Sequence, residues 1–245
     1  MSNLFSLRNI TKPLAFKADA SADGVLTLEI YDTVGADFFG EGITAKSISD
    51  AISTASDFKS ITLRLNSPGG DLFEGVTIHN LIKASGKPVN VVVDGLAASA
   101  ASLIAMAGDT CVMSDGSCMM IHRAMGLAGG YADDLRKTAD ILDTVTDSAA
   151  DIYVSRTGVK KDEVLALMAA ETWMTPKEAK DAGFATGTST QKGKDVRNVF
   201  NLSVFKNTPE SLQAKPNEVE PIEVSIDWQA QIDLMRKRLE LAKRK

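Results

Sequence analysis

The sequence predicts an α/β protein built on a mostly parallel sheet whose strands are joined by crossover helices. Apolar stretches typical of strands alternate along the chain with amphipathic stretches typical of helices, which is the pattern of a parallel sheet. The stretch Val89–Val93 is apolar except for one Asn, which favours a strand covered on both faces. Gly and Pro separate most of these stretches, so that the predicted elements are short and well delimited.

The remaining predicted strands are shorter or show alternation. Val25–Tyr31 and Ile61–Leu65 alternate apolar and polar residues, as half-buried strands do. Thr110–Met113 and Met119–His122 are two further short strand candidates.

The predicted helices have apolar faces and recognisable ends. Ala45–Ser56 places Ile48 and Ile52 on one face, and Leu72–Ala84 is closed by Gly86, a residue favoured after helix C-termini.

A long helix is predicted over Asp133–Arg156 and ends at Gly158; its apolar positions are Leu135, Ala139, Leu142, Val145, Ala149 and Ile152. Thr175, Pro176 and Glu178 then form the start of another helix, with an N-cap, a first-turn proline and a capping box. Gly183 ends that helix.

Composition excludes disorder throughout and gives no field for attracting polyanions. The 245 residues include 27 Lys and Arg against 32 Asp and Glu, a net charge of −5, and 44% of them are hydrophobic. Neither nucleic acid nor a membrane is therefore an expected partner. The sequence contains no signal-peptide pattern and no apolar window of the roughly 20 residues that span a bilayer, which predicts a cytoplasmic protein.

The cysteines and histidines do not form a metal-binding pattern. Cys111 and Cys118 are seven residues apart, and His79 and His122 both lie outside that segment. We therefore expect free thiols, no metal and no cofactor.

The chain divides by composition into four segments. Residues 1–22 are an N-terminal arm, 23–187 the main domain, 188–224 a polar, proline-containing linker, and 225–245 a helix. Apolar residues recur along that helix at steps of four and three, and its end is basic; the apolar positions are Trp228, Ile232, Met235, Leu239 and Ala242. Two heptads are too few for a stable coiled coil alone, so a solvated or docked tail is an alternative interpretation.

Three local features could carry chemistry, and each also has a structural interpretation. Ser99 lies in a small-residue turn between a strand and a helix, where unsatisfied backbone N–H groups could stabilise an oxyanion; it could also be a simple helix cap. Gly69 and Gly70 follow another strand and allow close backbone approach, or make a plain turn. His122 ends a short strand and is the better placed of two histidines for a general base, because His79 lies within a predicted helix.

Taken together, these features resemble the ClpP family of serine peptidases. The resemblance runs from about Val25 to Gly187 through SPGG, GLAASAAS, MMIHR and ETWMTPKEAKDAGFA, in order and at family-like spacing. It implies the ClpP/crotonase-like core of repeated ββα units, a long projecting handle helix and assembly into homo-oligomeric rings. The handle would be Asp133–Arg156.

The resemblance also implies a serine endopeptidase and its catalytic residues. Ser99 would be the nucleophile and His122 the general base, with the backbone N–H groups of Gly70 and Ala100 as oxyanion hole. Glu171 stands where the family has a catalytic aspartate. Because glutamate has a longer reach, Asp162 and Asp181 stay open as alternatives for the acid. The remaining candidates, Ser102, Cys111, Cys118 and His79, are interpreted as structural.

Within the family the chain is more similar to the phage and prophage branch of head-maturation proteases. The phrases FGEGITAK, SPGGDLFEG, DGLAASAASLIAMAGD, ADDLRKTADILD and ETWMT carry this similarity. It implies capsid and scaffold precursors as protein substrates, the chain itself as another, and a location in the cytoplasm or transiently inside procapsids. Residues 225–245 would then target scaffold or capsid, while a need for an unfoldase is left open.

Three alternatives remain at this stage. A crotonase-like acyl-CoA enzyme would use the oxyanion hole without needing Ser99 and His122 together, and a signal-peptide-peptidase relative would need a lysine as base. An assembly factor that keeps the fold without the chemistry is the third, suggested by Glu171 in the acid position.

Overall fold

The computed structural model describes residues 16–36, 42–55, 57–192 and 200–213. The chain divides into two units at Ala214 and Lys215. The second unit, and with it the helix expected over 225–245, lies outside the described residues.

One mixed sheet organises the first unit. Its strands are β1 (Lys17–Ala20), β2 (Val25–Ile30), β3 (Ser60–Ser67), β4 (Val89–Ala98), β5 (Thr110–Asp115), β6 (Cys118–Ile121), β7 (Thr172–Met174) and β8 (Gly187–Lys192). The order is β1-β2-β3-β4-β5-β8, and the pairs from β2 through β8 along this path are parallel. The α/β class with a mostly parallel sheet is thus confirmed.

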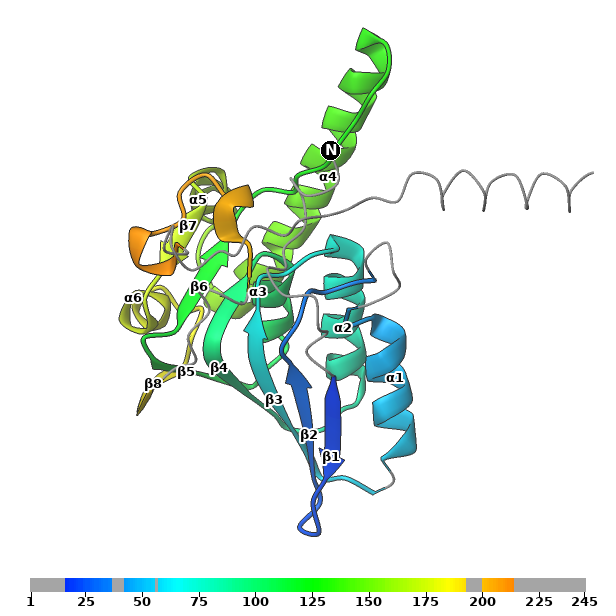
Figure 1. Ribbon diagram of the computed structural model, residues 1–245, viewed down its shortest axis with the longest axis vertical. Helices are drawn as coiled ribbons and strands as arrows, with labels where there is room; N and C mark the ends of the chain where they lie inside the picture. The colour runs from blue at the N-terminus through cyan, green and yellow to red at the C-terminus, as the bar shows by residue number, and fades with distance from the viewer. Residues whose placement is uncertain (1–15, 37–41, 56, 193–199, 214–245) are drawn as a thin grey trace, which may run out of the picture. The chain divides into compact units, whose positions relative to one another are not determined.

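Helices cover one face of the sheet. Figure 1 shows α1 (Ala45–Thr54) and α2 (Leu72–Ala84) on the same side of β1–β3, with α3 (Ala100–Ala105) following β4. The inward residues Ile30, Leu65 and Val93 are in register across three strands and are fully buried beneath these helices. Burial of this apolar layer holds the strand ends, and the loops that leave them, in fixed positions.

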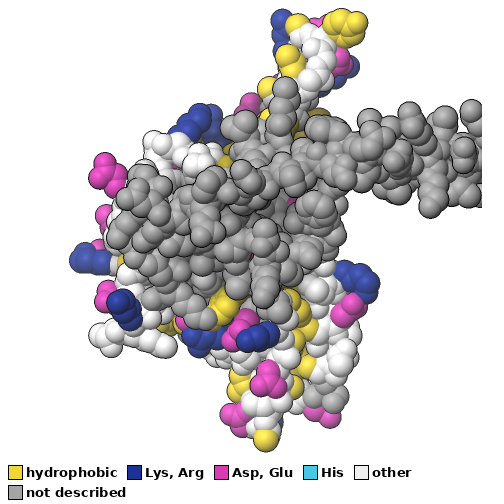
Figure 2. Space-filling model, viewed as in Figure 1, with side chains coloured by type: hydrophobic (Ala, Val, Ile, Leu, Met, Phe, Trp, Pro, Cys, Tyr) yellow, Lys and Arg dark blue, Asp and Glu magenta, His cyan; other side chains and the backbone are white. Residues whose placement is uncertain are grey.

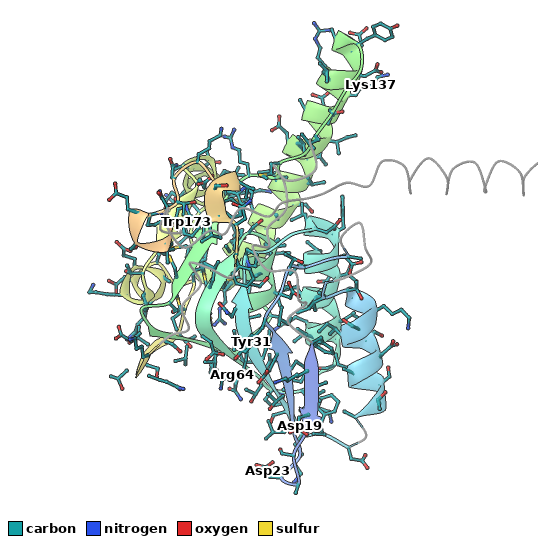
Figure 3. The ribbon with its side chains drawn as sticks, in the orientation of Figure 1. Asp19, Asp23, Tyr31, Arg64, Lys137 and Trp173 are labelled. Atoms are coloured by element: carbon teal, nitrogen blue, oxygen red, sulfur yellow. The ribbon has the colours of Figure 1, made fainter. Side chains whose placement is uncertain are left out.

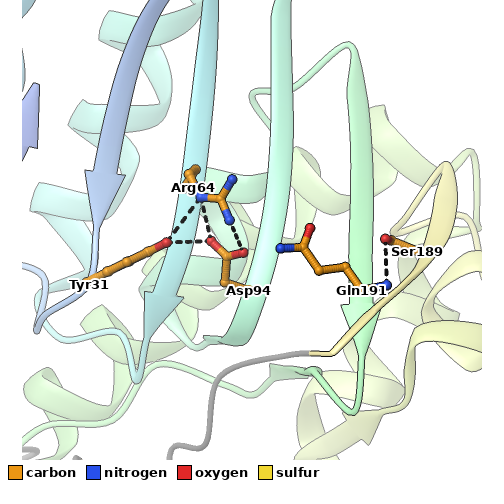
Figure 4. Close-up of polar contacts among 5 residues, drawn as sticks. All are labelled: Tyr31, Arg64, Asp94, Ser189 and Gln191. Carbon is orange, nitrogen blue, oxygen red and sulfur yellow. Dashed lines mark hydrogen bonds and ion pairs between the residues drawn. The ribbon is translucent and has the colours of Figure 1, made fainter. Parts of the chain in front are cut away.

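The opposite face of the sheet carries a polar network. Tyr31 follows β2, and its hydroxyl donates to Asp94 Oδ2 at 2.6 Å, while Arg64 on β3 donates Nε–H to the same oxygen at 3.0 Å (Figures 3 and 4). Burial and the neighbouring Asp94 raise the pKa of Tyr31 to about 12. Asn90 is exposed on this face, so the expectation that Val89–Val93 is covered on both sides is wrong for the start of β4.

A long helix, α4 (Ala132–Thr157), matches the expected handle. Its second half is buried through Thr146, Ala149, Ala150 and Tyr153, while its first half extends beyond the sheet (Figure 1). Apolar side chains lie exposed at the projecting end (Figure 2); Tyr131 is 86% exposed and Leu127 74%. Two more helices, α5 (Lys161–Ala169) and α6 (Pro176–Asp181), follow; α6 begins with the predicted Thr175–Glu178 capping box.

The predicted segment boundaries differ from the structure at both ends. Lys17–Ala20, expected within an N-terminal arm, pairs antiparallel with β2 and forms the edge strand of the sheet. Gly187–Lys192 continues the sheet beside β5 where a linker over 188–224 was expected. Residues 200–213 of the same expected linker include buried Phe200, Leu202 and Phe205.

Among the described residues, no helix is long and apolar enough to cross a membrane. The same part of the chain holds no cluster of three or more His, Cys, Asp or Glu side chains suited to a metal ion.

Candidate active site

Strand β4 changes its pairing partner along its length, and this change creates the candidate site. Asn90–Val93 pair with β5, whereas Leu96–Ala98 pair in parallel with β6. Because the ends of β4 and β6 lie side by side, Ser99 and His122 each leave the sheet at the same edge. The sequence predicted that the strand would end at Val93; it continues to Ala98 because β6 supplies a second partner.

Ser99 occupies a strained backbone conformation at the turn from β4 into α3. Its φ is 54° and its ψ is −127°, outside the regions that residues with a Cβ usually adopt. Its N–H donates to the Met120 carbonyl at 2.9 Å, and its own carbonyl accepts the Ser102 N–H at 2.9 Å. Strain of this kind persists only where the surrounding contacts fix the residue, and it is concentrated at functional sites.

The Ser99 hydroxyl lies directly against an imidazole. Ser99 Oγ and His122 Nε2 are 2.7 Å apart, and both residues are only partly buried. This is the distance at which a histidine can accept the proton of a serine.

Two residues that the sequence analysis did not connect with the site stabilise the Ser99 backbone through hydrogen bonds. Ser102 donates its hydroxyl to the Ser99 carbonyl at 2.6 Å, and its Oγ lies 2.7 Å from the hydroxyl of Tyr153 on α4. Tyr153 is fully buried among apolar side chains. A lone aromatic within an amphipathic helix gives no sequence signal for this contact, which depends on how α4 packs on α3.

The glycine pair lies directly beside Ser99. A Cβ on Gly69 would lie 2.6 Å from the Ala98 carbonyl oxygen and 2.7 Å from Ser99 Cβ, and its φ is +87°. A Cβ on Gly70 would lie 2.1 Å from the Val34 carbonyl oxygen. Both positions therefore require glycine.

The two backbone N–H groups expected to form the oxyanion hole are those of Gly70 and Ala100. Val34 bridges to Gly69 and Asp71, which leaves the Gly70 N–H without an acceptor among the described residues. Ala100 is the first residue of α3, where an N–H has no acceptor within the helix.

Glu171 lies near His122 without a direct hydrogen bond between them in the described part of the chain. Its carboxylate accepts the backbone N–H groups of Lys206 at 3.0 Å and Asn207 at 2.6 Å, and Trp173 Nε1–H at 3.3 Å. Glu171 also has a positive φ of 50°.

The two alternative acids lie elsewhere. Asp181 pairs with Lys177 on α6, and Asp162 is exposed in the first turn of α5. Among the described charged side chains, Glu171 is the one whose charge acts on the His122 ring. No lysine side chain in that part of the chain hydrogen-bonds to Ser99, so the structure offers no contact for a serine–lysine pair.

Burial dominates the protonation of His122. Burial lowers the pKa of His122 from its ordinary value of 6.5, while the Glu171 charge and the Arg123 backbone oppose that shift. The imidazole therefore stays neutral, as a general base must be, to a lower pH than a solvated histidine.

Apart from Ser102, the residues interpreted as structural are His79, Cys111 and Cys118. His79 is half-buried on α2 beside Asn80. Cys111 and Cys118 are buried and unpaired, and burial raises their pKa values to about 12 and about 11, which keeps both thiols protonated.

Comparison with known proteins decides the family. The family model described as Clp protease matches residues 43–192, more than half of the chain. The chain belongs to the Clp protease family. Clp proteases are serine endopeptidases, which makes the chain a member of a family of hydrolases that form rings and degrade proteins.

Two Clp relatives each match more than half of the chain. An ATP-dependent Clp protease proteolytic subunit 1 from Chlamydia abortus is 33% identical over 160 residues, 61% of this chain and 83% of the relative. A proteolytic subunit from Bacteroides fragilis is 34% identical over 127 residues, 51% of this chain and 61% of the relative.

A solved Clp structure shares the fold. A point mutant of ClpP1 from Listeria monocytogenes superposes with a TM-score of 0.58 at 24% identity, covering 69% of this chain and 92% of that one. The ClpP-like fold expected from the sequence is thereby confirmed, whereas the roles of individual residues here rest on their geometry.

Replacement of Gly69 by alanine tests the close packing at Ser99. We expect Gly69→Ala to lower the free energy of unfolding by more than about 1 kcal/mol, because the new Cβ meets backbone and φ is positive. Gly129→Ala is the matched control, since nothing lies within 4 Å of a Cβ there. Chemical denaturation measures both; equal stability of the two variants would contradict the packing argument.

Proposed function

We propose that this Clp protease hydrolyses peptide bonds through Ser99 as nucleophile and His122 as general base. The 2.7 Å contact between Ser99 Oγ and His122 Nε2, at a strained turn beside a glycine pair, carries the proposal. Neutral His122 takes the Ser99 proton as Oγ attacks the substrate carbonyl, because a serine hydroxyl is too weak an acid to ionise unaided.

The attack forms a tetrahedral intermediate whose negative charge falls on the former carbonyl oxygen. The N–H groups of Gly70 and Ala100 are the proposed donors to that oxygen. The C–N bond then breaks as His122 passes its proton to the leaving amine, which leaves an ester on Ser99. Water, deprotonated by His122, attacks the ester, and the serine hydroxyl is restored.

Glu171 is the proposed acid of the site. Its charge opposes the effect of burial on His122, and so favours the imidazolium that forms during each proton transfer. Since the structure has no direct hydrogen bond between the two described side chains, we assign Glu171 an electrostatic role that is smaller than that of a directly bonded aspartate.

We further propose that the substrates are capsid and scaffold precursors, cut during phage head maturation in the cytoplasm or inside procapsids. Similarity of the segments around Gly42–Lys46, Ser67–Gly75 and Ala132–Asp143 to that branch supports the proposal. The chain also extends past residue 192, where the family match ends, to a basic segment over 225–245 that we propose targets scaffold or capsid.

Ring assembly through α4 fits the same proposal. The apolar side chains exposed at its projecting end, Leu127, Tyr131, Leu135 and Ile141, would be buried between subunits. An inactive assembly factor and an acyl-CoA enzyme are the outcomes that the labelling experiment below distinguishes from a peptidase.

Labelling with a fluorophosphonate at pH 7.5 tests the nucleophile. We expect a single adduct on Ser99 by peptide mapping, none in Ser99→Ala, and labelling slowed by at least about 10³-fold in His122→Ala. Glu171→Ala should slow it by about 10- to 100-fold, because the carboxylate acts without a direct bond. His79→Ala is the matched control and should label like the wild type.

Oligomeric state is measured on the same samples by light scattering. An oligomer that takes no label would overturn the peptidase proposal and favour an assembly factor, or an acyl-CoA enzyme if acyl-CoA binds. Activity of His122→Ala would instead point to a different base.

The pH dependence of the labelling rate reports the base. Because burial depresses the pKa of His122, its neutral form persists below pH 6.5, and the rate should fall only as pH drops through that lower value. A midpoint above 6.5, or a rate flat down to pH 4, would exclude His122 as the titrating base.

Self-cleavage is tested in assembling particles. We expect a cut between residues 186 and 225 that requires Ser99, at a position outside β8 and outside residues 200–213, because the rest of this range connects the peptidase core to the proposed targeting segment. N-terminal sequencing of the products in wild type and Ser99→Ala measures it. Identical products in both would refute self-processing.

A further inference from the structure

Residues 200–213, here called the strap, lie beyond the segment that matches the Clp family. The family match ends at residue 192, so the contacts of the strap are additional to it. Phe200, Leu202 and Phe205 of the strap form a second apolar cluster with four residues of the site strands, namely Leu96 and Ala98 on β4 and Cys118 and Met120 on β6. The strap is therefore packed on the two strands that lead into Ser99 and His122.

The strap supplies most of the hydrogen bonds to Glu171. The N–H groups of Lys206 and Asn207 each donate to one carboxylate oxygen, at 3.0 and 2.6 Å, and Asn207 Nδ2–H donates to the Ala170 carbonyl at 2.8 Å. Hydrogen bonds to a carboxylate are stronger than those between neutral groups. These bonds fix both the carboxylate and the backbone just before it, where Glu171 has its strained positive φ.

The strap also covers His122. The Phe205 ring meets the His122 ring edge to face at 5.5 Å and the Trp173 ring at 5.8 Å, and Phe205 is only 6% exposed (Figure 3 labels Trp173 beside the strap). One short segment thus contacts both the base and the acid of the proposed site.

We propose that the strap is a positioning element of the active site, in which the Lys206 and Asn207 N–H groups hold Glu171 toward His122 while Phe205 shields the imidazole from water. This inference rests on the proposed function for its effect on catalysis. The contacts themselves can be tested without any catalytic activity.

The two actions of the strap have opposite effects on His122. Burial lowers the pKa of His122, and the Phe205 ring packs against the imidazole, whereas the charge of Glu171 raises that pKa. Ser99 contacts the His122 ring through a neutral hydroxyl, and Arg123 acts on it through its backbone. Among the described residues, Glu171 is therefore the one charged side chain that shifts the His122 pKa. A variant that removes only the cover by Phe205 should therefore raise the His122 pKa, and a variant that releases only Glu171 should lower it.

Lys206→Pro removes the N–H that donates to Glu171, and Lys206→Ala, which keeps it, is the matched control. Phe205 has φ −94° and ψ 141°, an extended conformation suited to the residue before proline. Phe205→Ala removes the shield, while Phe205→Leu keeps apolar cover. Glu171→Gln gives the shift produced by full loss of the charge.

The measurement is the pKa of each histidine in the full-length protein, by NMR of 13C-labelled histidine. The chain has only two histidines, so His79 serves as internal reference. We expect Lys206→Pro and Glu171→Gln to lower the pKa of His122, Phe205→Ala to raise it, and Lys206→Ala and Phe205→Leu to stay close to wild type. Fluorophosphonate labelling of Ser99 should slow by about 10-fold in Lys206→Pro and should not slow in Lys206→Ala.

Thermal unfolding shows that each variant is folded. Equal pKa values in Lys206→Pro and Lys206→Ala would overturn the proposal, as would shifts of the same sign in Lys206→Pro and Phe205→Ala, which indicate simple detachment of the strap. If wild-type Ser99 takes no label, the proposed function fails, while the His122 pKa still reports whether the strap acts as proposed.

Discussion

Strand β4 pairs with β5 through Asn90–Val93 and with β6 through Leu96–Ala98, and the positions of Ser99 and His122 depend on the second pairing. Parallel strands held in register end at the same edge of the sheet, so the residues that follow them meet. The hydrogen bond from the Ser99 N–H to the Met120 carbonyl holds the end of β4 beside β6. Ser99 Oγ therefore lies 2.7 Å from His122 Nε2. The glycine pair, α3 and the strap are all packed around that edge.

Electrostatic control of the site depends on a balance between burial and one nearby charge. Burial favours neutral His122, which can accept a proton, whereas Glu171 favours the charged form that follows proton transfer. Glu171 is held mainly by backbone N–H groups from a segment distant in sequence. The extra methylene of glutamate changes the reach of the carboxylate, and the Lys206 and Asn207 N–H groups fix where it lies.

Two segments that follow the predicted main domain are part of the fold. Strand β8 completes the sheet beside β5, and the segment 200–213 adds a second apolar cluster behind the site. The family match thus spans Ser99, His122 and the glycine pair, while residues 200–213 add contacts outside that match.

The sequence alone determined the fold class, the helices Leu72–Ala84 and Asp133–Arg156 to within one residue at each end, and the turn that carries Ser99. Local signals suffice there, because periodicity, caps and glycines act between neighbours in the chain. Residues 200–213 were predicted as linker because their composition is polar. Their three buried apolar residues, Phe200, Leu202 and Phe205, do not recur at a regular spacing that would indicate a helix or strand. Contacts of Tyr153 with Ser102 and of the strap with Glu171 join residues tens of positions apart. Only tertiary packing decides such contacts, because no local preference in the chain specifies which distant surface a buried ring or a carboxylate will meet.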